Sequence, residues 1–433
     1  MSGDNPGSNR YVIISSDCHA GADLPDYKPY LEQRWHEEFD SWAANYSDSW
    51  ADIDADSEWK AGVSSFMSPL NWDSNKRLEA LEAEGIVAEV LFPNTVPPFF
   101  PNGLLAAPGP RTAEEYERRW AGIKAHNRWL KDFCDAAPGR RFGVAQLLID
   151  DVDDAVREIR WAKEAGLRQV LLPSDHHEKL HHLYYASLEP VWTVCEELDM
   201  PIGRHGSVVG SDADPESVDA AHAIGVLETL YFGQRTLPQL VLSGVFERHP
   251  DLKFVFTELG TGTWIVDMIG GLDGFVTGSK MPGTIISMFA GKATTTLSML
   301  PSEYCRRNVY LGVQTTPSSF ERRHEIGLDR LMWGADFPHH EGTAPYTLKA
   351  LRGTVSSGNE AELRQLFAET AAGVYHADLP YLATIADRVG PTVEEVATPL
   401  RTEEMPADPN FAMIVEAGPG GLSNLVGPKR REG

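Results

Sequence analysis

The chain has 433 residues, 42% of them hydrophobic, which is enough to bury a large core and suits one barrel with insertions at least as well as several small domains. Its formal net charge of −25 argues against nucleic acid as a partner, because nucleic-acid binding depends on clustered Lys and Arg. The four cysteines, Cys18, Cys134, Cys195 and Cys305, lack the spacing of a zinc site or a disulfide framework, which favours a reducing cytoplasm.

Residues 1–10 are polar and are expected to form a disordered tail rather than a signal peptide. No later apolar run approaches the roughly 18 to 20 residues that span a bilayer, so we expect a cytoplasmic protein that does not enter a membrane. The first strand is predicted over 11–17. An insertion over 21–74 follows, and its tryptophans make it too aromatic for a disordered linker, so we interpret it as a lid or a subunit-contact element. These tryptophans are Trp35, Trp42, Trp50, Trp59 and Trp72.

From residue 75 onward, helical and strand patterns alternate along the chain. Further strands are predicted at 87–92, 141–149, 169–172, 200–205, 252–258, 308–313 and 330–335. Helices are predicted between them at 76–84, 113–134, 152–165, 188–198, 237–248 and 319–326. Eight strands separated by helices are the count of a (β/α)8 TIM barrel, which is therefore the predicted fold.

One domain is expected to contain the whole barrel, over residues 11–380. It carries the aromatic-rich insertion at 21–74 and a second insertion at 206–235. Two more helices are predicted at 347–352 and 360–375, and residues 381–433 are expected to form a C-terminal extension that packs on the barrel.

Candidate metal ligands occur at the ends of several predicted strands. Asp17 and His19 are two residues apart on the first strand, so their side chains point to the same side and could bind one ion. His205, Glu258 and Asp336 end the fifth, sixth and eighth predicted strands. The carboxyl ends of parallel barrel strands open on one face, so these residues should meet there. A mixture of carboxylates and imidazoles suits Zn, Fe or Mn.

Each of these residues also has a purely structural interpretation. Asp17 and Asp336 could hold turns through their side chains, His205 could be a hydrogen-bonded core histidine, and Glu258 could cap the next helix. Their shared position at one end of separately predicted strands is what favours a metal centre.

Five segments, taken in this order, carry a resemblance to a known family. They are Ile14-Ser-Ser-Asp-Cys-His19, Gly166-Leu-Arg-Gln-Val-Leu-Leu-Pro173, Pro201-Ile-Gly-Arg-His-Gly206, His249-Pro-Asp-Leu-Lys-Phe-Val-Phe-Thr-Glu258 and Arg323-His-Glu-Ile-Gly-Leu-Asp-Arg-Leu-Met-Trp-Gly-Ala-Asp-Phe-Pro-His339. Together they resemble the amidohydrolase-related (amidohydrolase 2) family of TIM-barrel metal-dependent hydrolases and decarboxylases. The resemblance implies a site with one or two metal ions, with His205 as the strand-five ligand and Asp336 as the aspartate that binds metal and moves protons.

Two positions depart from the pattern that many members of this family show. Asp17 stands where many have a histidine, which is similar to the decarboxylase branch, and Glu258 stands where many have the strand-six histidine. Asp336 and Glu258 are the predicted catalytic residues. Arg204, His177 and His339 are predicted to contact the substrate.

The resemblance and the ligand set favour a hydrolase or a non-oxidative decarboxylase that acts on a small cyclic or aromatic carboxylate or amide, with one or two divalent ions (Zn, Mn or Fe). The carboxylate-rich ligand set leaves a non-haem di-iron oxygenase, as in natural-product biosynthesis, as an alternative. A metal-free barrel that binds a ligand without catalysis is the third possibility. Family habit suggests a homodimer.

Overall fold

Eight parallel strands form a single sheet in sequence order in the computed structural model, which describes residues 9–46, 68–100, 109–173, 182–206, 218–290 and 292–416. The strands are β1 (Ile14–Ala20), β2 (Ala88–Pro93), β3 (Arg141–Gln146), β4 (Gln169–Leu171), β5 (Ile202–His205), β6 (Phe254–Thr257), β7 (Val309–Val313) and β8 (Leu331–Trp333). A parallel bridge joins Cys18 of β1 to Phe337, just beyond β8, so the sheet is nearly closed. The predicted (β/α)8 barrel is confirmed.

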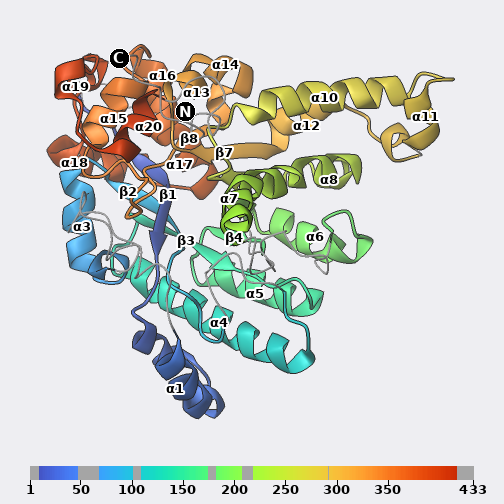
Figure 1. The fold of residues 1–433 in the computed structure, drawn as a ribbon, viewed down its shortest axis with the longest axis horizontal. Helices are drawn as coiled ribbons and strands as arrows, with labels where there is room; N and C mark the ends of the chain where they lie inside the picture. The colour runs from blue at the N-terminus through green and yellow to red at the C-terminus, as the bar shows by residue number, and fades with distance from the viewer. Residues whose placement is uncertain are drawn as a thin grey trace.

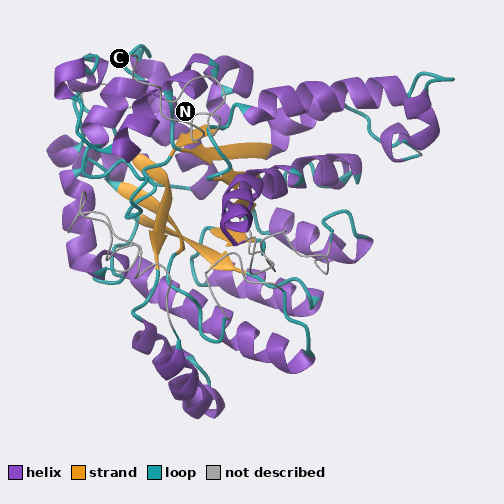
Figure 2. Ribbon diagram, viewed as in Figure 1, coloured by secondary structure: helices purple, strands orange, loops and turns teal. Residues whose placement is uncertain are grey.

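Helices surround the strands, as Figures 1 and 2 show. Those connected to the barrel strands are α3 (Ser74–Ala83), α4 (Ala113–Asp135), α5 (Val152–Glu164), α6 (Glu189–Glu197), α7 (Val218–Gln234), α8 (Thr236–Leu242), α9 (Val245–Arg248), α10 (Trp264–Ser279), α11 (Ile285–Phe289), α12 (Pro301–Asn308), α13 (Pro317–Glu321), α14 (Arg323–Ile326), α15 (Thr347–Thr354), α16 (Glu360–Arg364) and α17 (Thr370–Tyr375). All strand residues except Tyr310 are buried, because helices cover one face of the sheet and the barrel interior the other.

Local sequence signals set where several helices begin. The Thr112 hydroxyl accepts a hydrogen bond from the backbone N–H of Glu115 at the start of α4, and the Asp151 carboxylate accepts one from Asp154 at the start of α5. Such N-caps satisfy donors that the first turn of a helix leaves unpaired. The strand–helix junctions that position the barrel are therefore encoded locally.

The structure changes several predicted boundaries. β1 begins at Ile14 and continues to Ala20, so Asp17 and His19 lie inside the strand, beside a register shift between Ser15 and Cys18. The helix expected over 237–248 is two helices, because Gly244 adopts a left-handed conformation (φ 75°) between α8 and α9. The insertion expected over 206–235 contains a long helix, α7.

The first insertion packs against the loop that follows β2. It contains α1 (His36–Asn45), and the rings of Trp35 and Trp42 lie 5.7 and 5.8 Å from that of Phe99. Trp50 and Trp59 lie outside the described residues. The role of this segment as a lid or a subunit-contact element stays a prediction.

The last described helices lie on the side of the barrel where β8 and its helices lie (Figure 1). This region contains α18 (Leu379–Val389), α19 (Val393–Ala397) and α20 (Pro409–Glu416), and α19 and α20 both contact α15. In the opposite direction, α10 and α11 extend away from the barrel as an arm (Figure 1). Within the described residues, no helix has both the length and the apolarity needed to cross a bilayer.

Candidate metal centre

β1 presents two of the predicted ligands at the centre of the barrel. Asp17 and His19 are 1% and 2% exposed. Gly334, next to the end of β8, makes room for Asp17, because a Cβ atom at position 334 would lie only 2.7 Å from the Asp17 Cβ atom. A glycine at this point of the last strand is therefore part of the site.

Glu258 and Asp336 follow β6 and β8 in an unusual backbone conformation. Their φ angles are 53° and 55°, in the left-handed region that non-glycine residues rarely occupy. Hydrogen bonds hold both: the Asp336 N–H donates to the Asp17 carbonyl at 2.8 Å, and the Glu258 N–H donates to the Gly312 carbonyl at 3.2 Å. Such conformations persist where the surroundings over-determine them, and they cluster at functional sites.

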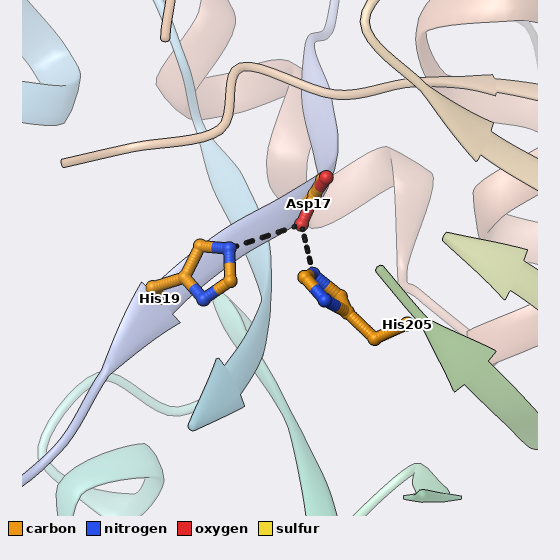
Figure 3. Close-up of side chains that lie close together, drawn as sticks. All are labelled: Asp17, His19 and His205. Carbon is orange, nitrogen blue, oxygen red and sulfur yellow. Dashed lines mark hydrogen bonds and ion pairs between the residues drawn. The ribbon is translucent and has the colours of Figure 1, made fainter. Parts of the chain in front are cut away.

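The carboxylate of Asp17 lies between two imidazoles, as Figure 3 shows. Its Oδ1 atom is 3.5 Å from Nε2 of His19 and 3.3 Å from Nε2 of His205. Nε2 of His19 is also 3.3 Å from Oδ1 of Asp336. Residues from β1, from β5 and from beyond β8 therefore converge as the sequence predicted.

In His19 and His205, a backbone carbonyl oxygen beside Nδ1 determines which ring nitrogen carries the proton. Nδ1 of His19 lies 3.2 Å from the Pro93 carbonyl oxygen, and Nδ1 of His205 lies 2.6 Å from that of Gly206. A carbonyl oxygen only accepts, so each Nδ1 must donate, and in the neutral ring each Nε2 presents a lone pair to a carboxylate. This arrangement, in which the outer nitrogen is held and the inner one is aimed inward, is that of metal-binding histidines.

Buried acceptors that face one another need a cation or a proton between them. Nε2 of His19 and Oδ1 of Asp336 form no hydrogen bond within the described structure. Burial alone would lower the pKa of His19, but the Asp17 and Asp336 carboxylates raise it well above its usual range. Burial likewise opposes ionisation of Asp336, yet His339 and His19 hold its pKa far below the usual value. The donor set fits a divalent ion that would replace the proton.

Three further side chains extend this cluster. Oε2 of Glu258 is 3.2 Å from Nδ1 of His205, and Nδ1 of His339 is 3.0 Å from Oδ1 of Asp336. Oε1 of Glu341 is 3.9 Å from Nδ1 of His339. The seven residues of the cluster form three overlapping groups, and within each group the ligand atoms lie within 4.8 Å of one another. The groups are Asp17 with His19 and His205; His19 with Asp336 and His339; and Glu258 with Asp336 and Glu341.

The carboxylates at the edge of this cluster raise one another's pKa. Burial and the nearby Asp336 and Asp17 carboxylates raise the pKa of Glu258 well above its usual range, although its side chain is 35% exposed. Burial and the Asp336 carboxylate raise the pKa of Glu341, which is 49% exposed. This crowding of negative charge is what a bound cation would relieve.

Of the predicted substrate contacts outside this cluster, the structure describes Arg204, which precedes His205 on β5. The Arg204 guanidinium is buried and donates to the Pro173 carbonyl. His177 lies outside the described residues. Glu341 and Asn94, which contacts His339, were not predicted. The run of polar residues after Asp336 was the available signal for Glu341, and the sequence carried none for Asn94.

The fold and the site together define a (β/α)8 barrel with a carboxylate–imidazole cluster at the carboxyl end of its strands, the face on which barrel enzymes place their active sites. The model of the amidohydrolase family matches residues 53–377, so the chain belongs to the amidohydrolase family. The resemblance inferred from the sequence motifs is therefore confirmed.

Curated relatives and solved structures extend this comparison. The gamma-resorcylate decarboxylase of Polaromonas is 27% identical over 253 residues, which cover 54% of this chain and 71% of that protein. The 5-carboxyvanillate decarboxylase of Sphingomonas paucimobilis has a TM-score of 0.60 at 18% identity, covering 85% of this chain and 100% of that one. The 5-carboxyvanillate decarboxylase of Novosphingobium aromaticivorans was solved with manganese and 4-hydroxy-3-methoxy-5-nitrobenzoic acid. It has a TM-score of 0.60 at 16% identity, covering 86% of this chain and 97% of that one.

Proposed function

We propose that this protein is a metal-dependent, non-oxidative decarboxylase that acts on a small aromatic carboxylate with a hydroxyl group next to the carboxylate. The observation that carries the proposal is the convergence of imidazole lone pairs and buried carboxylates around Asp17 and Asp336. It is supported by family membership and by relatives named as decarboxylases of hydroxylated benzoates.

Asp17, His19, His205 and Asp336 would hold the divalent ion. A mixed carboxylate and imidazole set accepts Mn, Zn or Fe, and we propose Mn because a structural neighbour contains it. When bound, such an ion supplies the positive charge that attracts and orients the substrate carboxylate.

Decarboxylation replaces the carboxylate on a ring carbon by hydrogen. The bond to the carboxylate carbon breaks, its electron pair stays on the ring carbon, CO2 leaves, and a proton must reach that carbon. We assign the proton to Asp336, which is 3% exposed and lies between His19 and His339. Glu258, at the open side of the cluster, is the proposed second acid–base group. Arg204 and His177 stay predicted substrate contacts.

Loaded with Mn, the protein should release CO2 from 2,6-dihydroxybenzoate (gamma-resorcylate) or 5-carboxyvanillate, one molecule for each decarboxylated product. In D2O the vacated ring carbon should carry deuterium. The Asp336→Asn variant should lose about 10³-fold in kcat, whereas Asp329→Asn, at an exposed site before β8, should not. Absence of CO2 from both acids and from other ortho-hydroxybenzoates, with Mn, Zn or Fe, would overturn the proposal.

An iron-dependent oxygenase is the second candidate, because four carboxylates lie in the cluster and hard oxygen ligands suit iron. The four are Asp17, Glu258, Asp336 and Glu341. Protein from iron-supplemented cells would then contain about two irons per chain and consume oxygen when substrate is added. Full decarboxylase activity under anaerobic conditions would rule this candidate out.

We also propose a homodimer in the cytoplasm. The arm of α10 and α11 exposes apolar side chains, among them Ile285 (70%), Met288 (76%) and Phe289 (83%). Residues 264–300 contain two Asp and two Lys, so this segment is neutral on a chain of net charge −25, and two copies can meet there without strong repulsion. Light scattering should give twice the monomer mass, and Phe289→Asp should halve it, whereas Tyr381→Asp, at an exposed aromatic on α18, should not.

A further inference from the structure

Gln146 is the last residue of β3, and its side chain points into the barrel. Phe142 and Val144, four and two residues before it, belong to a buried cluster that also contains Val255 of β6 and Met332 of β8. Only the interior of the barrel brings side chains of these three strands together. Successive side chains of a strand alternate between its two faces, so Gln146 lies on the interior face with Phe142 and Val144.

Gln146 also lies at the level of the metal centre along the barrel axis. The register of β2 with β3, continued by one residue, places Phe92 beside Val144. The Phe92 ring borders the metal centre, because its centroid lies 4.6 Å from that of the His205 ring. Gln146 is one interior position beyond Val144 toward the carboxyl ends of the strands, where the proposed ligands lie.

Asn94 and Gln146 occupy equivalent interior positions, two residues beyond Phe92 and Val144. Asn94 serves the metal centre, since its Oδ1 atom lies 3.0 Å from Nε2 of His339. The side-chain Nε2 of Gln146, by contrast, forms no hydrogen bond within the described structure, although this residue is only 5% exposed. Buried amides are nearly always hydrogen-bonded, so an unpaired donor at this level indicates a ligand that would accept from it.

The backbone of Gln146 is fixed although its side chain is unpaired. Its N–H donates to Oδ1 of Asn127 on α4 at 2.9 Å, and its carbonyl accepts from Nδ2 of Asn127 at 3.0 Å. The same Nδ2 atom donates to Glu158 on α5 at 2.8 Å, and Asn127 is fully buried. The end of β3 is therefore held by its surroundings, as is typical of residues that position a ligand.

The charges of the metal centre leave this amide a distinct role. In the proposed function, the centre holds the substrate carboxylate and the hydroxyl group next to it. The carboxylates of Asp17, Glu258 and Asp336 only accept hydrogen bonds when ionised, so they repel the lone pairs of any further oxygen on the ring. The Gln146 amide is uncharged and donates, so it attracts such an oxygen.

We propose that the side-chain amide of Gln146 donates a hydrogen bond to a second oxygen substituent on the substrate ring and thereby determines which hydroxybenzoates the protein selects. The inference rests on the proposed function, because the metal centre must hold the rest of the substrate. Gln146 takes no part in bond breaking or proton transfer. The substrate class is thus narrowed to hydroxybenzoates with a further oxygen on the ring.

Binding of unreactive analogues to the full-length, Mn-loaded protein tests this assignment. The probes are 2-nitrophenol and its derivatives with one additional ring hydroxyl, in which a nitro group replaces the carboxylate. Calorimetry should show that wild type binds at least one of the derivatives about tenfold more tightly than 2-nitrophenol, the effect of one hydrogen bond. Gln146→Leu and Gln146→Met remove the donor, so both should lose this preference while their affinity for 2-nitrophenol changes less than about twofold.

Gln169→Leu is the matched control. Gln169 is a buried glutamine at the amino end of β4, and its Oε1 atom accepts a hydrogen bond from the Tyr375 hydroxyl at 2.9 Å. This variant should keep the wild-type preference. Gln146→Leu replaces an unpaired buried amide by an apolar side chain, so it should melt no lower than wild type, and a lost preference then does not come from misfolding.

A preference that persists in Gln146→Leu and Gln146→Met, or a wild type that binds no derivative more tightly than 2-nitrophenol, would overturn the inference. Release of CO2 by a protein with either result would leave the proposed function standing. A preference that depends on Gln146 in a protein that decarboxylates no acid would leave only the assignment of Gln146 standing.

Discussion

The backbone N–H of Asp336 donates a hydrogen bond of 2.8 Å to the carbonyl oxygen of Asp17. One residue lies in the first strand and the other just beyond the last, so this bond closes the barrel and sets the spacing of two carboxylates at once. The neighbouring bond from the His19 N–H to the Phe337 carbonyl, at 2.7 Å, reinforces it. Barrel closure and ligand placement therefore have the same physical cause. A variant that displaces the backbone where β1 meets the segment after β8 should affect both.

Gly334→Ala should weaken metal binding at least tenfold, because its Cβ atom would lie 2.7 Å from the Asp17 Cβ atom and displace that side chain. The dissociation constant for Mn(II), measured by calorimetry, checks this expectation. Gly373→Ala on α17 is the control, since a Cβ atom there meets nothing within 4 Å. Equal affinities in the two variants would show that Gly334 does not make room for Asp17.

Removing the metal should lower the stability of the folded protein. A ligand that binds only the folded state at 100 times its dissociation constant adds about 2.7 kcal/mol, and the buried carboxylates of Asp17 and Asp336 are left crowded without it. Thermal unfolding with and without a chelator measures the change, which re-added Mn(II) should reverse. An unchanged melting temperature would mean that no ion was bound in this cluster.

Glu89→Gln should destabilise the fold by about 3 to 5 kcal/mol, because it leaves buried cations with a neutral partner. Glu89 on β2 is 1% exposed, with Arg77 at 2.7 Å and Arg141 at 3.3 Å. Urea unfolding at neutral pH gives the difference in free energy of unfolding. Glu321→Gln, at an exposed site at the end of α13, should change it by less than about 0.5 kcal/mol.

Wild type and Glu89→Gln, compared over a range of pH, should show how the stabilisation by Glu89 depends on pH. Burial opposes its ionisation, but Arg77 and Arg141 more than offset this and lower its pKa below the usual 4.5. A lowered pKa in the folded state contributes stability that is fully present above pH 4.5 and is lost as the pH falls through the lower value. The stability difference between wild type and Glu89→Gln should thus be constant above pH 5 and shrink in acid. A difference that grows in acid would contradict the assignment.

The barrel itself could be predicted because each strand is a short apolar run with a turn or helix signal beside it. The ligands followed from one rule, that the carboxyl ends of parallel strands share a face, and this rule brought Asp17, His19, His205, Glu258 and Asp336 together from four separate segments. Their metal-binding role stays a prediction until ions are counted.

What sequence reasoning missed depends on loop geometry and side-chain direction. Glu341 reaches the cluster because the chain turns back after Asp336, where the Thr343 N–H donates to the Ala335 carbonyl at 2.9 Å. Asn94 matters through a hydrogen bond with His339, far away in the sequence, which no local pattern encodes. α10 packs on α12 and α11 has no buried residue, and no local pattern in the sequence indicated that these helices project from the barrel.

Hydrogen bonds form a relay from the Ser68 carbonyl through the side-chain amides of Asn71 and Asn94 to Nε2 of His339. The direction in which these groups donate is set in the aromatic insertion. Ser68 lies near the end of this segment, and its carbonyl is the one member of the relay that cannot reverse its role. A rotation of that peptide group would let both amides flip and would move the His339 proton to the nitrogen that faces Asp336. The insertion could thus alter the affinity of the centre for a cation without supplying a single ligand.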